Sequence, residues 1–347
     1  MFRFSLKKIL LLLGLVAIIV AGRLYLEVYK FSANKQESIQ FEILKDESLF
    51  VLSERLHTEQ VIRSPWLFRK FLQVKGVDKS IHAGMFTVTE PITLARVVES
   101  LSRPSVEERT ITILPGWGLH EVAEYFAKEG IATPTSFYNL VGEPITLYSG
   151  KGVRIEAVQD LRLLLDKPTM VGFEGYLRPD TYRIYADASL EEIVVKLITA
   201  RAEQFTEQMY SDIAKSGRTV HEVMTMAGLV EREVRHQEDM AKVADIFWRR
   251  HDANWGMQAD STIHYITGKS GSVFTTAADR QSESAWNTYR YRGLPPGPIS
   301  NPSIGAIMAA IYPEKNDAWY FLTDFEGVAR YGRTLDEHNA NVNQYLR

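Results

Sequence analysis

Residues 219–251, TVHEVMTMAGLVEREVRHQEDMAKVADIFWRRH, carry the periodicity of one long amphipathic helix. Since each residue turns an α-helix by about 100°, an apolar stripe forms on one face, from Val223, Met226, Ala227, Val230 and Val234. Two residues turn the helix by roughly 200°, so Glu231 and Glu233 fall on opposite flanks of this stripe. The pattern predicts a helix packed against the core of a folded domain, with one carboxylate on each side.

The two glutamates differ in their neighbours. Glu231 has Arg235 one turn further on, a partner that would hold it ionised. Glu233 has Leu229 behind it and Gln237, not a cation, one turn ahead. A carboxyl group among apolar neighbours tends towards a raised pKa, which suits a general acid at neutral pH. The alternative is a solvated glutamate beside a core stripe.

The amino-acid composition excludes several functional classes for this chain. The chain has 347 residues, a formal charge of −3 and 24% charged residues, so nothing suggests a nucleic-acid partner. The absence of cysteine removes disulfides and thiol catalysis. His221 and Glu222 begin like a zinc-protease motif, but Thr225 stands where the second histidine belongs. We therefore expect neither a metal nor a cofactor.

The N-terminus predicts a membrane anchor. Lys7 and Lys8 precede an uninterrupted apolar run over residues 9–22. Tyr25 could lie at the membrane interface, so a helix within residues 1–30 would cross the bilayer once. Positive charge would keep the N-terminus in the cytoplasm and place the body on the extracytoplasmic, periplasmic side of the inner membrane. The alternative is a cleaved signal peptide and a secreted protein.

A repeat with a constant offset of 70 residues follows. The segment from Phe41 aligns with the segment from Ile111, with apolar residues recurring in both. Each copy has the pattern of a strand, a turn, an amphipathic helix and a Ser/Thr-Pro start to a second helix. A strand over residues 84–90 closes the first copy. Residues 31–107 thus have the strand–helix–helix–strand order of a LysM-like module, unless the two copies are merely convergent units.

Residues 108–347 predict a mixed α+β catalytic domain, so the fold class is α+β throughout. Residues 108–188 hold the second copy and a linker, and residues 189–347 form the catalytic core. The expected elements are an aromatic strand and turn over 173–185, helices over 189–215, 219–251 and 303–310, alternating loop and strand over 258–265 and 286–293, a strand over 318–323 and a last helix from 335.

Several motifs in one order resemble the YceG-like lytic transglycosylases, the endolytic murein transglycosylases. They are MAGLVEREV (226–234), GFEGYLRPDTY (172–182), VADIFWRR (243–250), QADSTIHY (258–265), WNTYRYRGLPPGPISNPS (286–303) and EHNANV (337–342). The resemblance spans nearly the whole chain. It departs from the family's usual pattern at Gly228, where serine is common, and at Ser261, where proline is common.

The resemblance implies a site and a reaction. The second glutamate of the helix motif, Glu233, would be the catalytic acid, in agreement with the argument from its neighbours. Residues in the matching motifs would position glycan: Gln258, Asp260, Asn287, Tyr289, His338 and Asn339. The alternatives are that Asn287 and Asn339 only satisfy loop backbone and that Asp260 caps a turn. Glu174 and Asp180 are expected to organise the strand and turn, with contact to the substrate as the alternative.

The implied reaction cleaves the β-1,4 bond between N-acetylmuramic acid and N-acetylglucosamine without water and leaves a 1,6-anhydro end. It would cut nascent peptidoglycan strands and limit their length, with peptidoglycan synthases as possible partners. Two alternatives stay open. One is a muramidase-type hydrolase with Glu233 as acid and Asp260 as base. The other is a membrane-tethered, non-catalytic scaffold that binds the cell wall through the LysM-like module.

Overall fold

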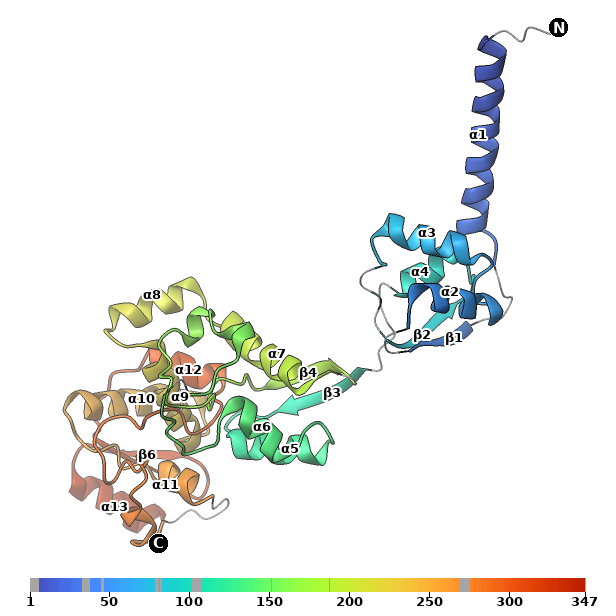
Figure 1. Cartoon of the computed structure of the whole chain (residues 1–347). Helices are drawn as coiled ribbons and strands as arrows, with labels where there is room; N and C mark the ends of the chain where they lie inside the picture. The colour runs from blue at the N-terminus through green and yellow to red at the C-terminus, as the bar shows by residue number, and fades with distance from the viewer. Residues whose placement is uncertain are drawn as a thin grey trace, which may run out of the picture. The chain divides into compact units, whose positions relative to one another are not determined.

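The computed structural model describes residues 6–32, 38–44, 47–78, 81, 83–101, 108–150, 152–186, 188–268 and 275–346, with side chains from residue 14. The chain divides into two compact units, residues 1–109 with 185–187, and residues 110–184 with 188–347. Thirteen α-helices and three two-stranded sheets occur in these described ranges, which confirms the mixed α+β class (Figure 1).

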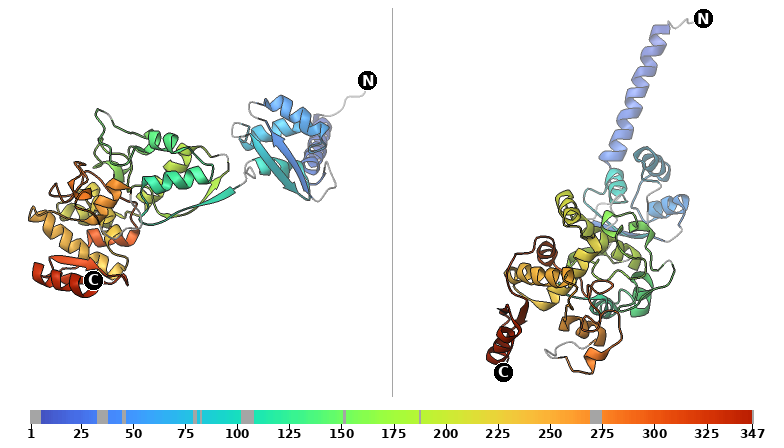
Figure 2. Two further views of the ribbon diagram at one scale, coloured as in Figure 1. Left: turned by 90° about the horizontal axis from the view of Figure 1, so that it is seen from below. Right: turned by 90° about the vertical axis from the view of Figure 1, so that its left-hand side faces the viewer.

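The N-terminal unit has the strand–helix–helix–strand order that the sequence predicted, followed by helix α4, which it did not predict. Strands β1 and β2 pair in antiparallel register, with Phe41 opposite Phe86. Their rings stack at 5.7 Å between centroids and are buried with the apolar faces of three helices. The elements are β1 (Ser38–Ile43), α2 (Leu49–Thr58), α3 (Pro65–Lys75), β2 (Gly84–Thr89) and α4 (Leu94–Leu101), seen from a second side in Figure 2.

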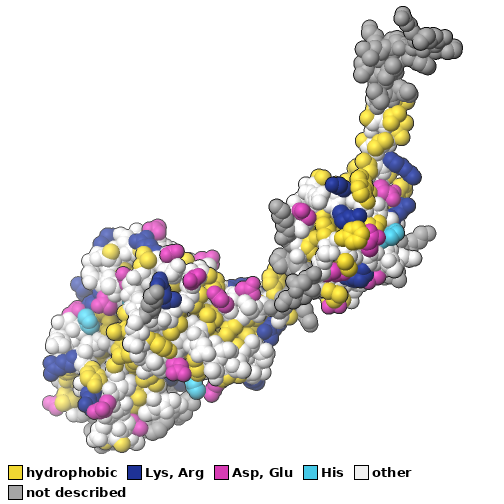
Figure 3. Space-filling view, in the orientation of Figure 1, with side chains coloured by type: hydrophobic (Ala, Val, Ile, Leu, Met, Phe, Trp, Pro, Cys, Tyr) yellow, Lys and Arg dark blue, Asp and Glu magenta, His cyan; other side chains and the backbone are white. Residues whose placement is uncertain are grey.

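Helix α1 (Leu6–Tyr29) precedes this unit, and its last turns join the core through Val28. Further back, large apolar side chains are exposed along the helix from Leu15 to Leu26, as Figure 3 shows. In the part of the chain that the structure describes, no helix combines the length and the apolar character needed to span a bilayer. The expected transmembrane span is therefore not supported.

The second repeat copy reproduces the first at almost the same offset. Helices α2 and α5 begin at residues 49 and 119, and strands β1 and β3 at residues 38 and 108. The second helix of each copy starts with proline after a Ser or Thr cap, Ser64 or Thr133. The copy comprises β3 (Glu108–Ile113), α5 (Leu119–Lys128) and α6 (Pro134–Val141), and β3 pairs with β4 (Asp180–Tyr185).

Helix α9 (Val220–Glu233) is the centre of the C-terminal unit. Ten of its fourteen residues are buried, and helices on several sides cover it (Figure 1). Gly228 allows a close approach, because a Cβ there would lie 3.2 Å from the carbonyl oxygen of Ser300. The surrounding elements are α7 (Leu190–Glu203), α8 (Glu207–Lys215), α10 (Gln237–Asp252), α11 (Asp260–Thr267), α12 (Ile304–Ile311), β5 (Tyr320–Thr323), β6 (Ala329–Gly332) and α13 (Leu335–Tyr345), with 3-10 turns at 156–158, 162–164 and 279–281.

Four of the expected elements were wrong. The helix predicted over 219–251 is two helices, because Val234 takes an extended conformation (φ −137°, ψ 145°) that ends α9. The helix predicted over 189–215 is also interrupted, and Thr206 caps the new start at α8. Residues 260–267 form helix α11, and residues 286–293 contain no strand. Capping boxes at Ser189 and Thr219 start α7 and α9, at the positions where the two predicted helices begin.

Candidate active site

Glu233 is the last residue of α9, so its carboxyl group lies at the C-terminal end of a buried helix. Val234, the next residue, is buried and directs the chain away from the helix axis. The backbone carbonyl of Glu233 accepts a hydrogen bond of 2.9 Å from Thr323 Oγ1, at the end of β5. The partial negative charge of a helix C-terminus disfavours an ionised carboxylate there.

The carboxyl group of Glu233 faces the first turn of α11. Its Oε1 accepts a hydrogen bond of 3.3 Å from the backbone N–H of Ser261. Burial has the largest effect and raises the pKa of Glu233. The Ser261 side chain and backbone lower this pKa. The charge of Asp260 raises it, and the charge of Arg250 lowers it. The direction of the net shift is upward, as a general acid requires. The sequence argument for Glu233 and the geometry agree on this direction.

Glu231 has a different partner from the one expected. Its Oε2 accepts hydrogen bonds from the Ser303 backbone N–H (2.9 Å) and Oγ (2.6 Å), at the start of α12. Arg235 lies beyond the end of α9, so the one-turn spacing that would have paired it with Glu231 does not exist. Glu231 therefore links the ends of two helices, and it is occupied by structural contacts.

Asp260 lies near Glu233 but is heavily engaged. Its Oδ1 accepts hydrogen bonds from Tyr289 OH (2.8 Å) and Thr275 Oγ1 (2.6 Å), and Arg280 lies 3.5 Å away. Burial and Asp260 together raise the pKa of Tyr289, which keeps the phenol protonated as a donor. Asp260 and Tyr289 thus form one hydrogen-bonded group beside the acid.

Arg250, which the sequence reasoning did not single out, is a buried cation of this site. It donates 2.6 Å hydrogen bonds to the carbonyl oxygens of Met257 and Trp319. Its charge interacts with Glu233 and with Tyr289, and burial lowers its own pKa. Arg249 and Arg250 are adjacent in the sequence, and Arg250 falls among the buried positions of α10. Only the tertiary fold shows which of the two faces Glu233.

His338 and Asn339 lie on helix α13. The His338 ring stacks on Tyr320 with centroids 5.5 Å apart. Its Nδ1 is buried and has no hydrogen-bond partner among the described residues. Burial and then Arg250 lower the pKa of His338, so the ring is neutral at physiological pH. The fold thus connects His338 to the site through Arg250, whereas the Asn339 side chain is exposed.

Gln258 and Asn287 have different environments. Gln258 is exposed, with a positive φ of 53° just before α11. Asn287 is fully buried, and its amide group donates to the carbonyl oxygens of Arg280 and Ser282. Its Oδ1 accepts from the Tyr289 N–H. This favours the alternative that Asn287 holds the loop that carries Tyr289.

A second buried carboxyl group, Glu174, joins the repeat copy to the catalytic core. Both of its oxygens accept the Leu119 N–H, at 3.1 and 3.0 Å, and Tyr265 OH donates to it at 3.1 Å. Burial raises the pKa of Glu174 to about 8 despite these donors. Asp180 instead pairs with Arg178 at 2.6 Å on the surface. Asp180 is thus paired next to its own strand, whereas Glu174 links its turn to α5 and α11.

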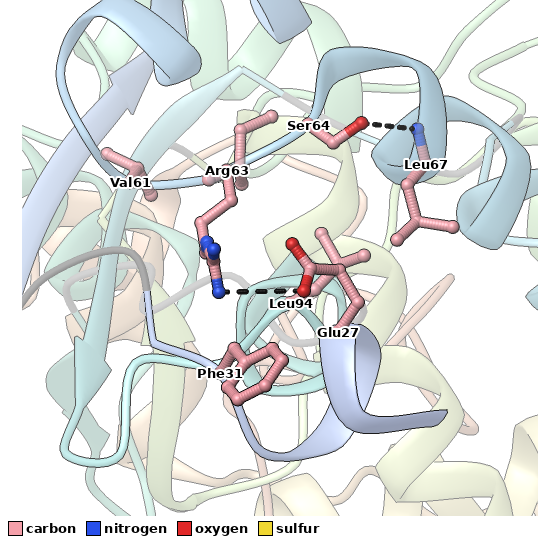
Figure 4. A pocket seen from close by; sticks show the side chains of 8 residues that line it. Glu27, Phe31, Val61, Arg63, Ser64, Leu67 and Leu94 are labelled. Carbon is pink, nitrogen blue, oxygen red and sulfur yellow. Dashed lines mark hydrogen bonds and ion pairs between the residues drawn. The ribbon is translucent and has the colours of Figure 1, made fainter. Parts of the chain in front are cut away.

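A pocket in the N-terminal unit is lined by α1 and the start of α3 (Figure 4). Glu27 and Arg63 pair across it at 3.5 Å, and the Arg63 guanidinium lies 5.1 Å from the Phe31 ring. The side chains of Glu27, Arg63 and Phe31 thus interact with one another, and we interpret the pocket as the junction between α1 and α3. Among the described residues, no group of three or more potential ligands could hold a metal ion.

A half-buried acid at a helix end, with a hydrogen-bonded carboxylate beside it, is an arrangement suited to an enzyme that protonates a leaving oxygen. The YceG-like family matches residues 41–344, and the chain belongs to this family. An endolytic murein transglycosylase of Bacillus subtilis is 27% identical over 90% of this chain and 86% of its own length. One of Streptococcus pneumoniae is 24% identical over 90% of this chain, which spans 59% of that protein. The crystal structure of a YceG-like protein from Listeria monocytogenes superposes with a TM-score of 0.58 and 25% identity, over 88% of this chain and 99% of that one.

Proposed function

We propose that this protein is an endolytic murein transglycosylase, a lyase in which Glu233 is the only carboxyl group that transfers a proton. The observation that carries the proposal is the position of Glu233, half-buried at the end of α9 with a raised pKa, in a family that includes relatives named endolytic murein transglycosylases. A protonated carboxyl at neutral pH is the form that a general acid must have before the bond breaks.

The reaction needs one carboxyl group because the nucleophile belongs to the substrate. Glu233 donates its proton to the glycosidic oxygen while the C1–O4 bond breaks and positive charge develops at C1 of the muramyl sugar. The C6 hydroxyl oxygen then attacks C1, and its proton passes to the ionised Glu233. The acid is restored, and the muramyl sugar ends as the 1,6-anhydro form.

The environment of Asp260 supports this lyase over a hydrolase. A hydrolase of this type needs a second carboxylate that is free to activate water. Asp260 is the carboxylate whose charge acts on Glu233, and Tyr289, Thr275 and Arg280 all engage its Oδ1, so that the surrounding loop fixes its orientation. Asp260 is better suited to hold the loop with Tyr289 in place and to raise the pKa of the acid through its charge.

The test is mass spectrometry of glycan strands treated with the full-length chain, with Glu233→Gln, and with Glu238→Gln. Glu238 is an exposed glutamate near the start of α10 and serves as the matched control. We expect internal fragments with 1,6-anhydro ends from the wild type and the control and none from Glu233→Gln. Ends heavier by one water indicate the hydrolase, and unchanged wall binding without cleavage indicates the scaffold.

The proposal extends to where the enzyme works. Peptidoglycan is extracytoplasmic, so the catalytic body would face that side of the cell membrane, with attachment through the apolar run of residues 9–22. The N-terminal unit, with its LysM-like element order, would bind glycan. Protease accessibility in spheroplasts tests the location, and pull-down of the chain on purified sacculi, with Glu233→Gln to prevent cleavage, tests binding.

A partnership with peptidoglycan synthases follows from the same proposal, because cutting nascent strands requires access to them as they form. Site-specific crosslinking from exposed positions of the chain in growing cells tests it. Recovery of a synthase adduct supports the partnership, and adducts with unrelated envelope proteins alone count against it.

A further inference from the structure

Ser261 carries a buried hydroxyl group that the reaction as described leaves unused. The residue is only 5% exposed and is the second residue of α11. Its Oγ makes no hydrogen bond of ordinary geometry to any described residue, although it lies close enough to Glu233 to lower the pKa of that carboxyl. A buried hydroxyl without a partner destabilises the folded state, because it has lost its hydrogen bonds to water. An unsatisfied group of this kind in a folded protein calls for a specific explanation.

The surroundings of the hydroxyl point to Glu233. The backbone N–H of the same residue already donates to Glu233 Oε1 at 3.3 Å. The Ser261 side chain itself lowers the pKa of Glu233, as a donor directed at a carboxylate does. The charged and titratable groups facing Glu233 are Asp260 on α11, Arg250 on α10 and Tyr289 in the loop before α12. None of these groups engages the Ser261 hydroxyl.

We propose that Ser261 is a positioning residue whose hydroxyl donates to Glu233 once Glu233 has lost its proton. This inference rests on the proposed transglycosylase function. Before bond cleavage, the protonated carboxyl needs only the N–H donor. After proton transfer, the carboxylate accepts both the N–H and the O–H of Ser261, and no proton leaves Ser261.

The arrangement also distinguishes the two oxygens of Glu233. Two donors from one residue would hold Oε1, which leaves Oε2 to deliver a proton to the glycosidic oxygen and to take one from the C6 hydroxyl. Hydrogen bonds to an ionised group are stronger than those between neutral groups. Ser261 therefore stabilises the state that exists between the two proton transfers more than the resting enzyme, which is the condition for faster turnover.

Two substitutions separate the two donors. Ser261→Ala removes the hydroxyl and keeps the N–H, whereas Ser261→Pro removes both, and proline fits the first turn of a helix. Ser211→Ala, on the exposed face of α8, is the matched control. The measurement is kcat and KM for release of 1,6-anhydro ends by the full-length chain across the pH range, with Glu233→Gln in parallel.

Loss of a donor to the ionised form raises the pKa of Glu233, so the protonated acid persists to higher pH. We expect the alkaline limb of the kcat/KM profile to move to higher pH in Ser261→Ala and further in Ser261→Pro. We also expect kcat to fall roughly tenfold in Ser261→Ala, with KM and the Ser211→Ala profile unchanged.

An unchanged profile shape in both Ser261 variants, with Glu233→Gln inactive, overturns this inference and leaves the function intact. A reduced folded fraction without a shift of the limb would mean that the hydroxyl only fills space, which also overturns it. Activity in Glu233→Gln would instead contradict the proposed function itself.

Discussion

Asp260 influences Glu233 through its charge, and this effect can be isolated. Asp260→Asn keeps an oxygen for Tyr289 and Thr275 but removes a negative charge that raises the pKa of Glu233. The pKa of Glu233 then falls, so on raising the pH the activity should begin to decline at a lower pH than in the wild type. We expect near-normal kcat at acidic pH and a shifted alkaline limb, measured by release of anhydro ends. A kcat reduced by orders of magnitude at every pH would support Asp260 as a base.

Glu174 gives the stability of the protein a pH dependence. Its pKa is raised to about 8 in the fold, whereas an unfolded glutamate titrates near its ordinary value of 4.5. Between these values the folded state holds a proton that the unfolded state lacks, so the free energy of unfolding falls as pH rises. The slope approaches roughly 1.4 kcal/mol per pH unit. Urea midpoints from pH 5 to pH 8 should show this slope in the wild type.

Glu174→Gln is the matched comparison, because its amide oxygen can still accept the Leu119 N–H. The variant should lose this contribution to the slope. Equal slopes for the two proteins would mean that Glu174 is not protonated in the folded state.

At the scale of elements, the contact between the end of α9 and the start of α12 stabilises the core without touching the acid. Ser303 Oγ accepts the Ala306 N–H as the cap of α12 and donates to Glu231. Ser303→Ala should lower the free energy of unfolding by about 1 kcal/mol or more. Chemical denaturation measures this loss. Activity per folded molecule should stay within a factor of two, roughly; a much larger loss would place Ser303 or Glu231 in the reaction.

The elements that the sequence predicted well are those with local signals. The predicted helix starts at 189, 219 and 303 coincide with the Ser or Thr caps of α7, α9 and α12, and the 70-residue repeat located the helices of both copies. The break at Val234 was missed because this residue continues the apolar periodicity and ends the helix only through its backbone conformation. Periodicity reports which face is buried and says little about where a helix stops.

The sequence singled out Glu233 from its apolar neighbours on α9 and from the family motif, while most groups that face its carboxyl come from other elements. Ser261 and Arg250 act on it from α11 and α10, and no spacing along the chain indicates those contacts. Asn287 shows the opposite case. It was expected to position glycan, but it is fully buried and hydrogen-bonded within its own loop. The same types of polar residue hold loops and bind sugars, so only their burial in the folded structure separates the two roles.

At the scale of the whole molecule, positively and negatively charged side chains are nearly balanced in number. The face of the C-terminal unit seen in Figure 3 shows Lys and Arg interspersed with Asp and Glu, and the formal charge of the chain is −3. Such a surface does not create a long-range field that would steer a strongly charged partner. The electrostatics that matter for the acid are the local ones of Arg250 and Asp260.

Helix α9 is enclosed along most of its length, whereas α13 has no buried residue. Amide hydrogen exchange should therefore differ sharply between them, since backbone groups of an enclosed helix meet solvent only when the molecule unfolds. Mass spectrometry of deuterium uptake should find α9 among the slowest segments and α13 among the fastest. Fast exchange in α9 would contradict its central place. The helix that carries Glu233 then belongs to the last part of the molecule to open, while His338 belongs to one of the first.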